Sequence, residues 1–99
     1  MAIAMLMDAP GDAHPGAYDT VNQKMDIENN PPAGLIVHSA GHAPDGSWRI
    51  FDIWESMEAF EKFNEERLGP ALREVIGEEM AAMEAPRREV YELHNVMRP

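Results

Sequence analysis

The chain has 99 residues, a formal net charge of −10 and no cysteine. Its length predicts a single domain, residues 1–99, that is too small to bury all of its apolar surface. The excess of 18 acidic over 8 basic residues would repel nucleic-acid phosphates and anionic membranes, so neither is expected as a partner. The lack of cysteine excludes disulfides and thiolate metal sites, and it fits a cytoplasmic location.

The first half of the chain predicts a strand, a helix and a hairpin. The apolar run Ala2–Met7 ends in DAPGD, which is typical of a strand closed by a turn and is too short for a signal or membrane segment. From Pro15, apolar residues at helical spacing predict a helix that ends before the tandem prolines 31 and 32. Two β-branched or aromatic runs, Gly34–Gly41 and Trp48–Trp54, flank the turn sequence APDGS and predict a β-hairpin.

The second half predicts a helix and a final strand. Ser56 can cap the helix, whose apolar stripe continues beyond Pro70 at a position that suits the first turn of a helix. The acidic stretch Gly77–Arg88 is interpreted as a mobile connection to a last strand, Glu89–Val96.

The predicted order of elements is β-α-β-β-α-β, which indicates an α+β, ferredoxin-like fold. In this fold a four-stranded antiparallel sheet carries two helices on one face. The other face stays bare, and an exposed apolar surface of that size usually marks an interface. We therefore expect a homodimer in which two sheets face each other.

The hairpin turn predicts which residues of its two strands are neighbours. Pro44 and Asp45 in a type I turn, followed by Gly46, describe a three-residue loop that fixes the register. This register gives three predicted pairs on one face of the hairpin: Ala40 with Ile50, His38 with Asp52, and Ile36 with Trp54. The other face is predicted to carry Leu35, Val37, Ser39, Phe51 and Ile53. A slip of one residue would instead pair His38 with Phe51.

The sequences WES (54–56), AF (59–60) and RLGPAL (67–72) resemble the dimeric α/β barrel superfamily, and the resemblance covers the whole chain. Members of this superfamily include antibiotic biosynthesis monooxygenases, which oxidise aromatic polyketides without metal or flavin, haem-degrading monooxygenases, stress-responsive barrels and many proteins of unknown role. The resemblance implies a homodimeric barrel with a cavity between the sheet and the helices of each subunit. It also implies a cofactor-independent enzyme.

In the haem-degrading relatives a tryptophan just before the second helix lines the cavity, and Trp54 occupies this place. His38 and Asp52 would lie on the same face. An imidazole there could accept a phenolic or enolic proton, which would make an electron-rich anion that attacks oxygen. The predicted roles are His38 as catalytic base and Asp52 as its orienting partner, with Trp54, Tyr18 and His94 binding an aromatic or enolic substrate.

Each of these residues also has a structural interpretation. A cross-strand histidine and aspartate can simply satisfy each other, and this is the commoner case. Trp54 can be a core aromatic residue, Tyr18 a packing residue of the helix, and His94 a polar residue of an edge strand. The alternative function is a non-catalytic barrel that binds a small apolar ligand or serves in assembly. An enclosed, partly apolar cavity at His38 and Asp52 would favour a ligand site, whereas filling by Trp54, Phe60 and methionine side chains would favour a scaffold.

A metal centre is not expected. The four histidines are scattered, without the HxH, HxxxH or HExxH spacing of metal sites. The predicted second helix, Met57–Ile76, lacks the proximal histidine of the haem-degrading enzymes, so haem degradation is not expected either.

Overall fold

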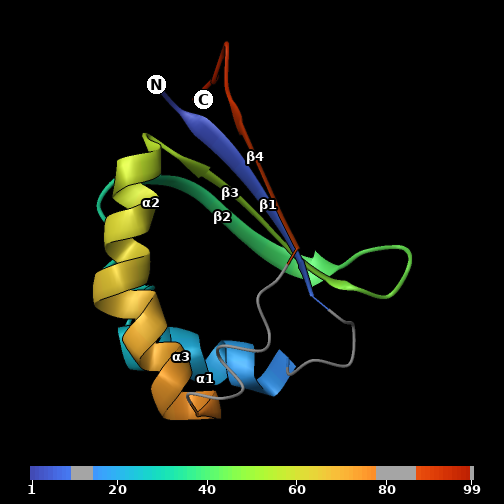
Figure 1. Ribbon diagram of the computed structural model, residues 1–99, viewed down its shortest axis with the longest axis vertical. Coiled ribbons are helices and arrows are strands. Elements are labelled where there is room, and N and C mark those ends of the chain that lie inside the picture. The colour runs from blue at the N-terminus through green and yellow to red at the C-terminus, as the bar shows by residue number, and fades with distance from the viewer. Residues whose placement is uncertain (10–14, 78–86, 99) are drawn as a thin grey trace.

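An antiparallel sheet of four strands, in the order β2-β3-β1-β4, forms one layer of the molecule (Figure 1). The structure is a computed structural model that describes residues 1–9, 15–77 and 87–98. The central strands are β1 (Ile3–Ala9) and β3 (Trp48–Trp54), with β2 (Leu35–His42) and β4 (Arg87–Glu92) at the edges.

The helices form the second layer and lie on one face of this sheet (Figure 1). Helix α1 spans Pro15–Met25, and the second helical region runs through α2 (Met57–Phe63), a π-helical turn η1 (Asn64–Leu68) and α3 (Gly69–Ile76). The predicted β-α-β-β-α-β order and the α+β, ferredoxin-like fold are confirmed. Among the described residues, no helix has the length and apolar character needed to span a membrane.

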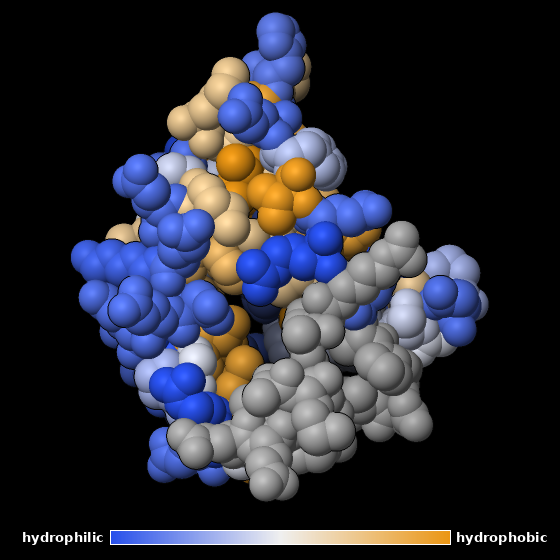
Figure 2. Space-filling view, in the orientation of Figure 1, coloured by the Kyte–Doolittle hydropathy of each residue, from blue (hydrophilic) through white to orange (hydrophobic). Residues whose placement is uncertain are grey.

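The hydrophobic core lies between the two layers. It is built from β1, the end of β3 and the inner faces of the helices, and its largest fully buried side chains are Trp54, Phe60 and Met5. Figure 2 shows hydrophobic side chains in the space between sheet and helices, while the outer face of α2 and η1 is hydrophilic. The alternation of β1 explains this arrangement, because Ile3, Met5 and Met7 all point to the same side of the strand and are buried.

The predicted capping of the second helix is confirmed. Ser56 has an extended backbone, and its hydroxyl oxygen accepts a hydrogen bond from the backbone N–H of Ala59 over 3.1 Å. Glu58 lies in the first turn, where the helix dipole favours a negative charge. This cap fixes the point at which the chain leaves β3 directly after Trp54.

The hairpin register is confirmed at the turn and wrong at the far end. Residues 38 and 52 pair as predicted, as do residues 40 and 50. Trp54, however, pairs with Leu35 and not with Ile36, because the register shifts by one residue between Leu35 and Val37. The shift turns Leu35, predicted for the bare face, toward the core, against which it packs. Burial of the leucine side chain there outweighs the loss of regular pairing.

Two strand boundaries differ from the predicted ones. Strand β1 continues through Asp8 and Ala9, where Asp8 pairs with Arg49 of β3 and forms an ion pair with it. Strand β4 runs over Arg87–Glu92 and not Glu89–Val96, because Glu92 already pairs with Ile3, the first residue of β1. Residues 78–86 of the predicted mobile connection lie outside the described residues.

Candidate functional site

The centre of the candidate site is a contact between His38 of β2 and Asp52 of β3. The Nδ1 atom of His38 lies 2.6 Å from Oδ1 of Asp52. The carboxylate is buried, with only 4% of the residue exposed, whereas a quarter of the His38 side chain remains accessible. The turn-derived register places these residues opposite each other on the helix-covered face, since Asp52 also pairs with the buried Met5 of β1.

Trp54 completes the hydrogen bonding of the carboxylate. Its indole Nε1 donates to Oδ2 of Asp52 over 3.2 Å. Because residues two apart on a strand share a face, the alternation of β3 alone places both side chains on the core side. The indole ring packs against Phe60 and Phe63 and is almost fully buried. Trp54 thus holds the carboxylate from the side of the core, while His38 meets it from the side of β2.

Tyr18 of α1 reaches the other ring nitrogen of His38. Its hydroxyl oxygen lies 2.5 Å from Nε2, and the two rings stack with their centroids 6.0 Å apart. Tyr18 thereby extends the contact into a chain of four side chains, Tyr18–His38–Asp52–Trp54, which we call the polar relay. Its members come from α1, β2 and β3, so the relay forms only when the helix docks on the hairpin.

The chemistry of the partners assigns the donors in the polar relay. An ionised carboxylate only accepts hydrogen bonds, so Nδ1 of His38 carries the proton that faces Asp52. In a neutral imidazole the remaining nitrogen, Nε2, then has the free lone pair and accepts from the hydroxyl of Tyr18. The arrangement orients a basic nitrogen toward a phenol, which is the geometry that a proton-accepting histidine requires.

The surroundings of Tyr18 favour its neutral form. Burial raises the pKa of the Tyr18 phenol, and the nearby negative charges of Asp52 and Asp19 raise it further, while a hydrogen bond with Asn22 opposes the shift. A phenol with a raised pKa remains a hydrogen-bond donor over the whole neutral range. In the resting protein, His38 is therefore the base of this pair and Tyr18 its donor.

The structure does not bring all five predicted site residues together. His94 lies beyond the end of β4 and is exposed, and among the described residues no hydrogen bond or ring contact is found between it and the polar relay. The other four residues are the members of the relay. The catalytic and binding roles predicted for all five stay predictions.

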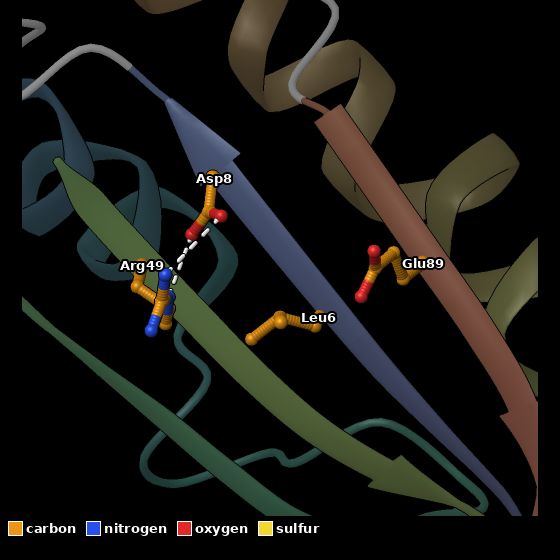
Figure 3. Close-up of a pocket in the computed structure, with 4 residues that line it drawn as sticks. All are labelled: Leu6, Asp8, Arg49 and Glu89. Atoms are coloured by element: carbon orange, nitrogen blue, oxygen red, sulfur yellow. Dashed lines mark hydrogen bonds and ion pairs between the residues drawn. The ribbon is translucent and has the colours of Figure 1, made fainter. Parts of the chain in front are cut away.

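A hollow of about 210 Å³ lies on the helix-free face of the sheet and is lined by Leu6, Asp8, Arg49 and Glu89. Figure 3 shows Asp8 of β1 and Arg49 of β3 turned toward each other, with Glu89 on the neighbouring strand β4. The guanidinium Nε donates to Asp8 over 2.8 Å, so these two charges largely neutralise each other. We place the candidate chemistry at the polar relay, because there a basic nitrogen of His38 faces the hydroxyl of Tyr18, a proton donor.

Trp48, which is not among the predicted site residues, also lies beside the polar relay. It shares the parity of Ile50, Asp52 and Trp54 along β3, a signal that already places it on the helix-covered face. In the structure its ring meets Tyr18 edge to face at 5.4 Å between centroids, and it meets His42 in the same manner at 5.0 Å. In the described part of the chain, no group of three or more histidine or acidic residues is arranged to hold a metal ion.

No protein-family model and no curated protein matches the sequence. Solved structures do match it. SnoaB from Streptomyces nogalater, a cofactor-independent oxygenase, superimposes with a TM-score of 0.65 at 11% identity, covering 97% of this chain and 96% of SnoaB. A candidate antibiotic biosynthesis monooxygenase from Deinococcus radiodurans gives a TM-score of 0.65 at 11% identity and covers 100% and 98% of the two chains. NE2512 from Nitrosomonas europaea, of unknown function, gives 0.62 at 17% identity and covers 99% and 92%.

These likenesses confirm the predicted resemblance at the level of the fold. The matches extend over nearly the full length of both chains, at identities of 11–17% for these three. Identity this low shows the fold alone and carries no residue roles. The chain therefore has the ferredoxin-like fold that the cofactor-independent oxygenase shares with proteins of unknown function.

Proposed function

We propose that the protein is a cofactor-independent monooxygenase that acts on an aromatic or enolic small molecule. The observation that carries the proposal is the polar relay, in which a buried carboxylate orients His38 and a phenol occupies the basic nitrogen. An orienting acid, a base and a donor in hydrogen-bond contact are the parts needed to remove a proton from a weak acid. The fold shared with the oxygenase SnoaB supports the choice of reaction.

The proposed reaction converts a CH₂ group beside an aromatic ring or carbonyl into a carbonyl group. The enol form gives its O–H proton, through the phenol of Tyr18, to Nε2 of His38, and the imidazolium is stabilised by Asp52. The enolate transfers one electron to O₂, and the resulting carbon radical and superoxide combine to form a C–O bond. The peroxide takes back the proton, and loss of the second C–H proton breaks the O–O bond and releases water. The balance is CH₂ + O₂ → C=O + H₂O, so the substrate supplies all the electrons.

Oxygen uptake with enolisable aromatic probes tests this proposal. Anthrone, 1,8-dihydroxyanthrone and 1-naphthol are offered to the metal-free protein, and oxygen consumption is followed together with product absorbance. We expect His38→Ala to lower the rate by about 100-fold or more, which is the usual contribution of a positioned acid–base group. Ser39→Ala is the matched control, because this exposed neighbour of His38 lies on the helix-free face of the same strand, outside the polar relay. Unchanged turnover in His38→Ala would contradict the assigned role.

One observation favours the alternative of a non-catalytic barrel that binds a small apolar ligand or serves in assembly. Trp54, Phe60 and Met5 are fully buried and fill the space on the core side of Asp52. Filling of this space by Trp54, Phe60 and a methionine side chain fits a scaffold. A protein that consumes no oxygen with any of the probes would favour this function. In that case the polar relay serves to satisfy a buried carboxylate.

A further inference from the structure

The polar atom left without a partner beside the polar relay is the indole nitrogen of Trp48. Its Nε1 atom is buried, and it has no hydrogen-bond acceptor in the part of the chain that the structure describes. The ring lies between Tyr18 and His42, and it contacts both edge to face. The other tryptophan of the chain behaves differently, since the indole nitrogen of Trp54 donates to Asp52.

A buried N–H group without an acceptor is uncommon because it loses its hydrogen bond to water and gains nothing in return. Packing against Tyr18 and His42 does not require the indole nitrogen, since a phenylalanine ring would supply a similar edge-to-face contact. A hydrogen-bond acceptor on a bound ligand would explain why the protein has an indole N–H donor at this position. The contact with Tyr18 puts such a ligand next to the basic end of the polar relay.

We propose that Trp48 is a ligand-binding residue whose indole N–H donates to a carbonyl oxygen of a flat, neutral aromatic ketone held beside Tyr18. The inference rests on the proposed function only for the class of ligand. The aromatic rings of Tyr18, Trp48 and His42 favour a flat aromatic molecule. The net charge of −10, together with the carboxylate of Asp52 two hydrogen bonds away from Tyr18, disfavours a ligand that carries a carboxylate of its own.

A pair of matched ligands tests the hydrogen bond in the unaltered protein. Anthrone carries the carbonyl group, and 9,10-dihydroanthracene has the same three rings with a CH₂ group in its place. Each is titrated without oxygen into ¹⁵N-labelled protein while the two indole N–H signals are recorded by NMR. We expect anthrone to move the Trp48 proton signal downfield, as hydrogen-bond formation does, and dihydroanthracene to leave it in place.

Trp54 is the internal control, because its N–H already has an acceptor in Asp52 and its signal is not expected to move downfield. The two signals are assigned with the variant Trp48→Phe, or with Trp54→Phe if the first does not fold. The inference is overturned if the Trp48 signal does not respond to anthrone, or if it responds equally to both ligands. If the acceptor of the Trp48 N–H is an ordered water molecule and not the ligand, the Trp48 signal does not respond to anthrone.

A binding measurement on Trp48→Phe gives a second readout. Loss of one hydrogen bond should weaken the binding of anthrone by about tenfold, while the affinity for dihydroanthracene changes far less. Equal weakening of both ligands shows that only the ring contributes, which also overturns the inference. Failure of the proposed function is distinguishable, because a protein that binds anthrone through Trp48 but consumes no oxygen refutes the monooxygenase and leaves the hydrogen bond standing.

Discussion

At the scale of single residues, the fold accepts a buried carboxylate because two donors meet it. Asp52 receives one hydrogen bond from His38 and one from Trp54, so each carboxylate oxygen has a partner. An unpaired carboxylate at 4% exposure would be severely destabilising. The two donors come from different strands, and the carboxylate therefore also ties β2 to the end of β3.

Tyr18 leads to a prediction about alkaline stability. Burial raises the pKa of its phenol above the ordinary value near 10. A raised folded-state pKa means that its contribution to stability is fully present below the unfolded pKa and is lost as the pH rises through the folded pKa. We expect the free energy of unfolding to fall between about pH 8 and about pH 11, and we expect Tyr18→Phe to show a smaller fall. Urea denaturation at the two pH values measures both quantities.

The control for this prediction is Tyr91→Phe, which removes a phenol that is 53% exposed on the helix-free face. This variant should lose stability at alkaline pH as the unaltered protein does. An alkaline loss that is the same in the unaltered protein and in Tyr18→Phe would mean that other groups, and not the phenol in the polar relay, cause the effect.

The sequence could predict one contact of the polar relay better than the others. A three-residue turn fixes the hairpin register over the next few residues, so the pairing of His38 with Asp52 follows from local chemistry. The contact of Tyr18 with Nε2 depends on how α1 docks on the sheet, which is set by packing over the whole core. The free indole nitrogen of Trp48 is likewise a property of its three-dimensional surroundings. Parity along β3 indicates only the face on which the ring lies.

At the scale of elements, local turn chemistry determines the pairing at the near end of the hairpin, whereas packing against the core determines it at the far end. The pairing predicted from the turn holds from His42 down to Val37 and fails at Leu35. The influence of the turn on the strand register weakens with each residue away from it. At Leu35, packing of the side chain against the core determines the pairing instead. A bulge is the local device by which a strand changes the face that a side chain occupies. Residue 36, where the register shifts, is an isoleucine and not a glycine or proline, so the sequence gives no local signal of the bulge.

The π-helical turn η1 joins α2 to α3 and anchors α1. Within it, Arg67 donates to the backbone carbonyl oxygens of Met25 and Asn30, over 2.6 and 2.8 Å, and so holds the chain that follows α1. The turn also brings the backbone N–H of Gly69 to the carbonyl oxygen of Asn64, five residues earlier. This hydrogen bond leaves little space around the glycine.

We therefore expect Gly69 to be an exception to the rule that alanine suits a helix better than glycine. Replacing a helical glycine by alanine usually stabilises a helix by about 0.5–1 kcal/mol. Here a Cβ atom on Gly69 would lie 2.9 Å from the backbone oxygen of Asn64, and backbone cannot move aside as a flexible side chain would. We expect Gly69→Ala to lower the free energy of unfolding by about 1–2 kcal/mol, in the range of other overpacking changes. Urea denaturation measures the difference.

Gly41→Ala is the matched control, because a Cβ atom built on this strand glycine meets nothing within 4 Å. That variant should be as stable as the unaltered protein or slightly more so. A Gly69→Ala protein with increased stability would show that the π-helical turn relaxes to an ordinary α-helix without cost.

At the scale of the whole molecule, the two faces of the sheet differ in what covers them. The helices cover one face (Figure 1), while the other carries the Asp8–Arg49 pair (Figure 3). This second face also carries exposed or half-exposed apolar side chains. Val37 is 43% and Tyr91 53% exposed on this helix-free face. Apolar side chains gathered on one face favour association, whereas a charge of −10 on each copy opposes it.

The homodimer expected from the sequence stays a prediction, and these two opposing effects make it testable. We expect a mass of twice 11.1 kDa in analytical ultracentrifugation, with a dissociation constant that falls as salt screens the repulsion between the copies. Val37→Glu places a charge on the exposed apolar face and should weaken the dimer by about tenfold or more, because the carboxylate must be desolvated. Gln23→Glu adds the same charge at an exposed position of α1 and should have little effect. Equal dissociation of the two variants would show that total charge governs association, and a monomer at all salt concentrations would leave the helix-free face open to solvent.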